Sequence, residues 1–166
     1  MKHANAGISG IVAALLAVSS LIECAVAQDG PGATSAVDRV EYVSDRPYQE
    51  TIQQLQWTLG GFGITVVYAT DFQEVLKKMK VQTGHAAIFE VMRRDWAKTL
   101  IEEDRSLPAI LPLRIYVFED PSGKTRLSYD RPSRMLDPHP SEKVRAFGHL
   151  LDEKMRSVML QAATKR

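Results

Sequence analysis

Apolar and polar residues alternate along this chain with two different periods, and the changes of period mark where strands and helices are expected. Alternation or a short apolar run rich in β-branched and aromatic side chains indicates a strand. Five segments show that pattern: residues 37–44, 64–68, 85–91, 113–119 and 125–129. Apolar residues three or four positions apart indicate amphipathic helices. Four segments show this second pattern: residues 47–59, 71–79, 93–103 and 144–162.

Capping and turn residues predict where these elements begin and end. Asp45 is expected to cap the first helix, and the glycine pair at residues 60–61 to end it. Asp71 and Glu74 have the spacing of a capping box at the start of the second helix. Residues 120–123 (DPSG) predict a tight turn, which joins the last two strands into an antiparallel hairpin.

The last helix carries the clearest apolar stripe in the chain, and we expect that stripe to be part of the core. Its members are Val144, Phe147, Leu151, Met155, Val158 and Ala162. The predicted order of elements is β-α-β-α-β-α-β-β-α. The sequence therefore predicts an α+β fold: a single sheet with an antiparallel hairpin, helices packed on it, and a long C-terminal helix.

The N-terminal segment has the features of an export signal. Lys2 precedes an apolar run over residues 8–22, and residues 25–27 (AVA) provide the small side chains that a signal peptidase accepts. The predicted divisions of the chain are a signal peptide, residues 1–27; a flexible leader, residues 28–36; and a folded domain, residues 37–163.

This interpretation places the mature protein in the periplasm or outside the cell, with no membrane span left after processing. Two alternatives stay open. The apolar run could be retained as an anchor, although a spanning helix needs about 20 mainly apolar residues. Cys24 could instead be lipidated, although the acidic Glu23 before it is unfavourable for that processing.

Composition narrows the classes of function. The net charge is +1, and no basic stripe is interleaved with aromatic residues, so we expect no nucleic-acid partner. The single cysteine, Cys24, lies inside the predicted signal. A mature chain without thiols cannot form disulfides, use a cysteine nucleophile or bind metals through cysteine.

No pattern of side chains predicts catalysis or metal binding. Outside the signal the histidines are His85, His139 and His149, and their spacing matches no compact zinc motif. His149 and Glu153 lie four positions apart on one helix face, which is more typical of a surface pair than of a shared metal. No serine lies in a nucleophile elbow or in a recognisable arrangement with a histidine and a carboxylate. We therefore predict neither a catalytic residue nor a metal site.

His85 and Met92 are candidates for binding a cofactor. A histidine at the edge of an apolar strand can ligate haem, and Met92, one strand length away, is a candidate soft axial ligand. The simpler interpretation is that His85 makes a hydrogen bond at the sheet edge while Met92 fills a gap in the core. No cofactor is predicted on that interpretation, and haem is the alternative.

Three aromatic residues near the hairpin are candidates for a binding face. Tyr116 and Phe118 share one face of their strand, and the partner strand carries Tyr129. If no helix covers that face, the three side chains form an aromatic patch for a ligand or a second subunit. If a helix covers it, they are ordinary core residues.

Two groups of segments resemble a known family. They are residues 51–55 (TIQQL) with 61–64 (GFGI), and residues 111–120 (LPLRIYVFED) with 123–124, 127–129 and Pro132. On these segments the chain resembles the family called domain of unknown function DUF302, over about residues 37–159. The resemblance implies a compact α+β domain with one twisted sheet, similar in outline to the TATA-box-binding-protein-like group. It also implies association into dimers, and it implies no activity.

The chain departs from the pattern of that family at two places. Residues 111–113 (LPL) stand where many members have Leu-Pro-Cys, and residues 91–93 (VMR) stand where a Cys-x-Pro stretch is frequent. Any thiol-based or metal-based role of cysteine-bearing relatives therefore does not carry over.

Two hypotheses about function follow. The first is an exported, non-catalytic accessory protein that binds a small apolar ligand, a protein partner or a second copy of itself through the sheet face. The second is a haem or redox-cofactor protein that uses His85, Met92 or both. The visible absorption spectrum of the purified protein would distinguish them.

Overall fold

A computed structural model describes residues 38–81 and 83–165, so the predicted signal peptide and leader lie outside the described residues. The domain is built on one five-stranded sheet with the order β1-β5-β4-β3-β2, and each strand is antiparallel to its neighbours. The strands are β1 (Arg39–Val43), β2 (Thr65–Asp71), β3 (Ala86–Met92), β4 (Leu113–Glu119) and β5 (Thr125–Asp130).

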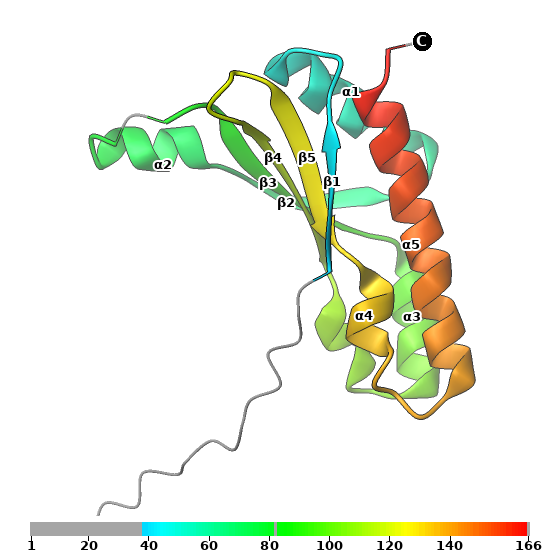
Figure 1. Cartoon of the computed structure of the whole chain (residues 1–166). Coiled ribbons are helices and arrows are strands. Elements are labelled where there is room, and N and C mark those ends of the chain that lie inside the picture. Colours follow the sequence, from blue (N-terminus) through cyan, green and yellow to red (C-terminus); the bar gives the residue numbers. More distant parts are fainter. Residues whose placement is uncertain (1–37, 82, 166) are drawn as a thin grey trace, which may run out of the picture. The chain divides into compact units, whose positions relative to one another are not determined.

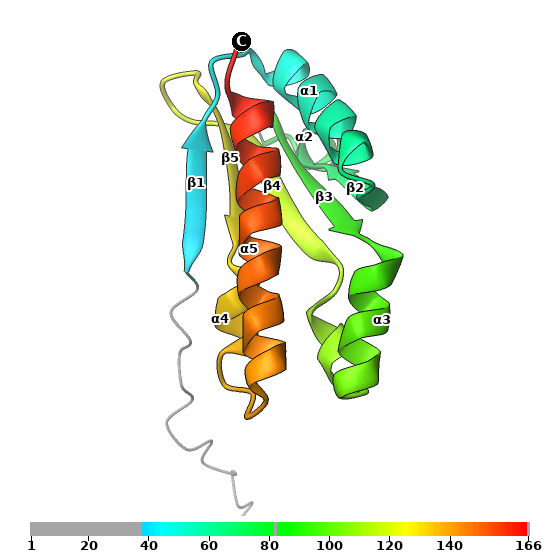
Figure 2. The same cartoon turned by 90° about the vertical axis from the view of Figure 1, so that its right-hand side faces the viewer.

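The helices are distributed unevenly about this sheet. Two of them, α1 and α5, lie across one face, and α3 and α4 lie beyond its end (Figure 2). The short α2 projects from the opposite side of the sheet (Figure 1). The helices are α1 (Tyr48–Gly61), α2 (Phe72–Lys78), α3 (Arg94–Glu103), the 3-10 helix η1 (Leu107–Ile110), α4 (Pro132–Leu136) and α5 (Glu142–Ala163). The predicted α+β class, single sheet, hairpin and long C-terminal helix are confirmed.

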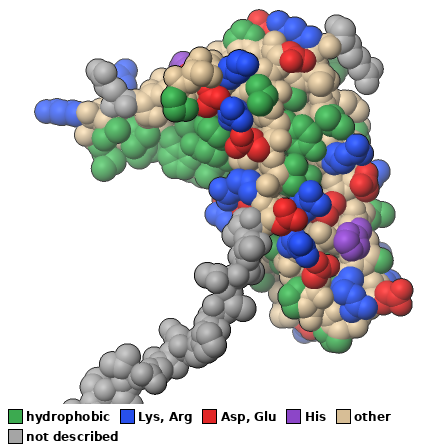
Figure 3. Space-filling view, in the orientation of Figure 1, with side chains coloured by type: hydrophobic (Ala, Val, Ile, Leu, Met, Phe, Trp, Pro, Cys, Tyr) green, Lys and Arg blue, Asp and Glu red, His purple; other side chains and the backbone are tan. Residues whose placement is uncertain are grey.

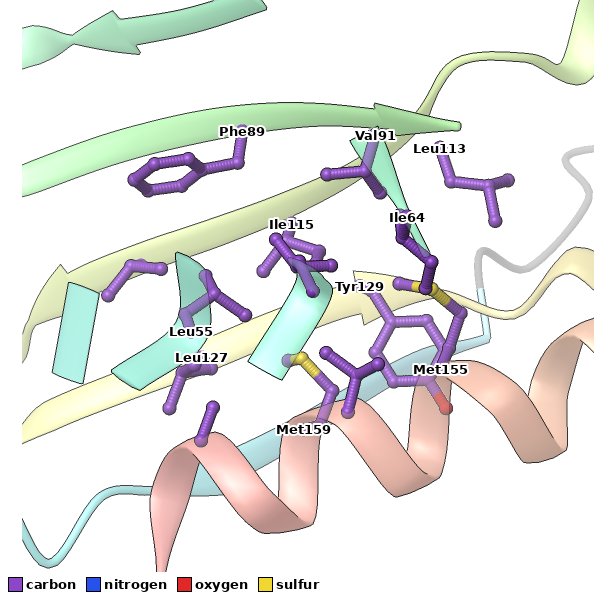
Figure 4. Close-up of a cluster of buried hydrophobic side chains, with 14 of the residues drawn as sticks. Leu55, Ile64, Phe89, Val91, Leu113, Ile115, Leu127, Tyr129, Met155 and Met159 are labelled. Atoms are coloured by element: carbon purple, nitrogen blue, oxygen red, sulfur yellow. The ribbon is translucent and has the colours of Figure 1, made fainter. Parts of the chain in front are cut away.

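The core lies between the sheet and the pair α1 and α5. Alternate residues of β4 point into it, because successive side chains of a strand face opposite ways. Ile115 and Val117 are fully buried there and contribute to one cluster with Leu55 of α1 and with Met155 and Met159 of α5 (Figure 4). The apolar stripe predicted for the last helix is part of this core from Phe147 onward, whereas Val144 packs in a second buried cluster with Leu100 and Leu136.

Two helix ends differ from the prediction in detail. Asp45 does not cap α1: the N-cap residue is Pro47, and no side chain caps the helix. The Thr51 hydroxyl donates a hydrogen bond to the carbonyl of Pro47 at 3.0 Å, inside the first turn. The backbone leaves α1 through Gly63, whose φ of +66° belongs to the left-handed region that favours glycine. The predicted cap of α2 is confirmed, since the Asp71 carboxylate accepts a hydrogen bond from the backbone N–H of Gln73 at 2.8 Å.

Candidate functional site

The face of the sheet opposite α1 and α5 is the part of the domain that is left open. Hydrophobic side chains gather along the underside of α2 and on the adjoining sheet (Figure 3). Residues of β3 and β4 that point away from the core, among them Ile88 and Tyr116, contribute to this surface. We call it the open face.

The open face owes its shape to α2, a helix of seven residues none of which is buried. Its apolar stripe therefore lies outside the core. Phe72 and Leu76 line a cavity against the sheet, while Val75 and Met79 are exposed, Met79 by 67%.

The cavity between α2 and the open face has a volume of about 400 Å³. We call it the groove. Its apolar lining consists of Phe72, Leu76, Ala86, Ile88 and Tyr116. Its other lining residues are Arg39, Thr83, Arg114, Ser128, Tyr129 and Asp130. An apolar wall with a few polar groups is typical of small-molecule sites, whose volumes run from about 300 to 1,000 Å³.

Aromatic rings join the two sides of the groove. Tyr116 and Phe118 are stacked, with ring centroids 4.8 Å apart and planes at 15°. Phe72 of α2 meets the edge of Tyr116, with centroids 6.3 Å apart and planes at 82°. Both geometries are favourable for aromatic pairs. Tyr116 therefore links α2 to the sheet.

The charged side chains of the open face are mostly paired. Arg39 makes two hydrogen bonds to the Asp130 carboxylate, of 2.8 and 3.2 Å. Arg126 pairs with Asp120 at 2.7 Å and with Glu41 at 2.6 Å. Hydrogen bonds from the Ser122 hydroxyl and from Arg126 hold the pKa of Asp120 well below its usual range.

Arg114 is the exception among the arginines of the open face. It is exposed, it lines the groove, and it has no ion-pair partner within residues 38–81 and 83–165. Glu90 lies directly across from it on β3 without forming an ion pair. The groove therefore carries one arginine whose positive charge no carboxylate neutralises by direct contact.

The structure separates the three aromatic residues predicted to share a face. Tyr116 and Phe118 lie together on the open face, as their spacing indicated. The placement of Tyr129 with them is wrong, because Tyr129 pairs with Ile115 and shares its side of the sheet. There Tyr129 is only 4% exposed and packs in the core with Met155 (Figure 4). Burial, the largest cause, raises the pKa of its hydroxyl.

His85 immediately precedes β3, and Met92 is the last residue of that strand. The ring of His85 stacks on Tyr48 of α1, with centroids 4.8 Å apart, so it faces the core side. Met92 is seven positions further on and therefore points to the other side of the sheet. Seven residues of strand span about 23 Å. One haem cannot contact both side chains, and the arrangement gives the haem alternative no support.

The remaining candidate chemistry is scattered. His139 lies 3.8 Å from the Asp104 carboxylate, and His149 is exposed on α5. Among residues 38–81 and 83–165 no three or more histidine, aspartate or glutamate side chains come together as a metal site. In the same ranges, no helix has the length and apolar content that a membrane span requires.

Sequence reasoning missed three residues of the groove. The spacing of Phe72 and Leu76 predicted an amphipathic helix, but nothing in the local sequence shows that its apolar side lines a groove. Arg114 did carry a signal, because it alternates with Tyr116 and Phe118 along β4 and so shares their face.

Comparison with known proteins gives the family and the fold. The sequence profile of the family described as "Domain of unknown function DUF302" matches residues 40–162. Among solved structures, the chain is similar to the crystal structure of an uncharacterized conserved DUF302 protein from Bacillus stearothermophilus. The TM-score is 0.70 at 16% sequence identity, covering 76% of this chain and 99% of that one. No curated protein matches the chain.

Proposed function

The chain belongs to the DUF302 family, and from that premise we propose that it is a non-catalytic binding protein. Its ligand is a small apolar molecule held in the groove between α2 and the open face. The family is described without a known function, so the surface of this chain carries the proposal.

The observation that carries the proposal is the uncovered aromatic lining of a cavity of about 400 Å³. Tyr116, which lines the groove, and Phe118, which stacks on it, are only partly buried. A ligand that covers them removes apolar surface from water, which stabilises a complex by roughly 25 cal/mol for each Å² buried. The groove also has room for an aromatic ring beside the stacked pair.

The polar groups of the groove favour binding over catalysis. They are two arginines, one aspartate and the hydroxyls of Ser128 and Thr83, besides Tyr129. Asp130 is held by Arg39, so it is a poor general base. His85, the histidine nearest the groove in sequence, stacks on Tyr48 on the other side of the sheet. Ser128 therefore has no base beside it to activate its hydroxyl.

Fluorescence titration with the neutral probe N-phenyl-1-naphthylamine tests the proposal. We expect saturable enhancement of probe fluorescence at one site per chain. Tyr116→Ala should weaken binding about fivefold, because an aromatic contact contributes about 1 kcal/mol. Ile88→Trp should fill the groove and abolish binding.

Trp57→Ala is the matched control, since Trp57 is an aromatic residue of α1 that is 80% exposed and does not line the groove. It should leave the affinity unchanged. Absence of saturable binding, or equal losses in Tyr116→Ala and Trp57→Ala, would contradict the proposal.

Because the sequence predicts a signal peptide, the proposal includes that binding takes place outside the cytoplasm. Protein recovered from the periplasm or the medium is then expected to begin at Gln28 on N-terminal sequencing. A lipid-modified start at Cys24 would instead place the domain at a membrane surface.

A further inference from the structure

We infer that the ligand is an amphipathic anion: an apolar body, with room for an aromatic ring, that carries one negatively charged group, which Arg114 binds. This inference rests on the proposed function and specifies the chemical class of its ligand.

The first step is the charge balance of the groove. Its lining contains Arg39, Arg114 and Asp130 as the charged residues, a net charge of +1. Arg39 and Asp130 neutralise each other through their two hydrogen bonds. Arg114 is therefore the one charged lining residue of the groove without an ion-pair partner among the residues that the structure describes.

The second step is whether the guanidinium group of each arginine is free to bind a ligand. A guanidinium group already engaged by a carboxylate has to give up those hydrogen bonds before it can bind a ligand. Arg39 and Arg126 are engaged in this way. Arg114 is not, and its planar fork of donors suits two parallel hydrogen bonds to a carboxylate, sulfonate or phosphate.

The third step is the distance between charge and rings. Arg114 precedes Tyr116 by two residues on the same face of β4, and strand geometry separates such residues by about 7 Å. That separation is about the length of one aromatic ring with its substituent. A ligand can therefore place its ring on Tyr116 and Phe118 while its anionic group reaches Arg114.

Glu90 limits the class of ligand further. It lies directly across from Arg114 on β3, so a second negative charge on the ligand would be brought close to this carboxylate. Like charges at such distances repel each other. A singly charged ligand is accordingly favoured over a dianion.

A pair of fluorescent probes that differ only in charge tests the inference on the full domain. 8-Anilinonaphthalene-1-sulfonate and N-phenyl-1-naphthylamine have the same aromatic body, and only the first carries an anionic group. We expect the sulfonate to bind about tenfold more tightly at low salt, as a charge-assisted pair predicts. Added salt should reduce that preference, because the pair is exposed.

Arg114→Gln should lower the affinity for the sulfonate about tenfold more than the affinity for the neutral probe, and Arg114→Lys should restore part of that difference. Arg105→Gln is the matched control: Arg105 is also exposed and unpaired within the described ranges, but lies outside the groove. It should change neither affinity.

The outcomes separate this inference from the proposed function. Equal affinities for the two probes, or a sulfonate affinity that Arg114→Gln leaves intact, would overturn the inference while binding of the neutral probe upholds the proposed function. Saturable binding of neither probe would overturn both.

Discussion

The two faces of the sheet use the same strands for different purposes, and β4 shows the contrast within one segment. Ile115 and Val117 point to α1 and α5 and are fully buried. Arg114, Tyr116 and Phe118 point the other way and line or border the groove. One face stabilises the domain, and the other is left available to a ligand.

The difference between the faces follows from the helices assigned to them. α5 has 22 residues, eight of them buried, whereas α2 has seven residues and none buried. Seven helical residues span about 10 Å, whereas five strands spaced about 4.8 Å apart form a sheet about 19 Å wide. α2 therefore covers part of the open face and leaves a groove beside it. A short amphipathic helix can thus shape a binding site where a long one completes a core.

The largest effect is expected from disrupting the closed face, the face of the sheet that α1 and α5 cover. Leu151 of α5 is fully buried, and Leu151→Asp places an unpaired charge in the core. Such a change costs more than about 4 kcal/mol, which is comparable with the whole stability of a small domain. The cooperative thermal transition should disappear. His149→Ala, two residues away on the exposed side, should change the free energy of unfolding by less than about 0.5 kcal/mol. Equal damage by both changes would mean that α5 is rotated.

The contrast can be sharpened with neighbouring residues of β4. Ile115→Ala leaves a cavity in the core and should cost about 3 kcal/mol in urea unfolding. Tyr116→Ala should cost less than half of that, because its ring is only partly buried and contacts Phe118 and Phe72 on the open face. Only the second variant should also weaken probe binding. A larger stability loss for Tyr116→Ala would show that the open face is part of the core.

The smallest expected effect concerns a hydroxyl on the closed face. Tyr48 is buried, and its hydroxyl has no hydrogen-bond partner among the described residues. Tyr48→Phe should therefore change the free energy of unfolding by less than about 1 kcal/mol at pH 8.

Alkaline pH makes the same hydroxyl measurable. Burial, helped by the charges of Asp71 and Glu119, raises the pKa of Tyr48 to about 12, against about 10 for an unfolded tyrosine. The folded state then retains a proton that the unfolded state loses, so this contribution to stability is complete below pH 10 and is lost as the pH rises to 12. Between pH 8 and pH 12, the free energy of unfolding of Tyr48→Phe should therefore rise by about 2 kcal/mol relative to that of the unmodified protein. Parallel stability profiles for the two proteins would contradict this assignment.

The sequence by itself determined which segments form helices or strands, and which residues of one element share a face. The buried stripe of α5, the limits of β4, and the shared face of Tyr116 and Phe118 follow from the spacing of apolar residues. These features depend only on the geometry of the helix and of the strand, which every residue of the element repeats. The order of these elements predicted the α+β class, which the structure confirms. The family resemblance predicted membership of the DUF302 family, which the comparisons confirm.

The tertiary structure decided which side chains of each strand point into the core and which point to the open face. A hairpin loop of residues 120–123 would pair Glu119 with Lys124 and place Tyr129 beside Arg114. The actual loop also includes Lys124, with Gly123 at a φ of +79°, so that Glu119 pairs with Thr125 and Tyr129 moves to the core side. A shift of one residue reverses every side chain of a strand.

The groove was equally inaccessible to local reasoning. The groove exists because the apolar stripe of α2 does not pack into the core. Arg114 has no ion-pair partner because the nearby carboxylates pair with Arg39 and Arg126 instead. Both outcomes are set by contacts between residues far apart in the chain, whereas periodicity records only the direction in which neighbouring residues point.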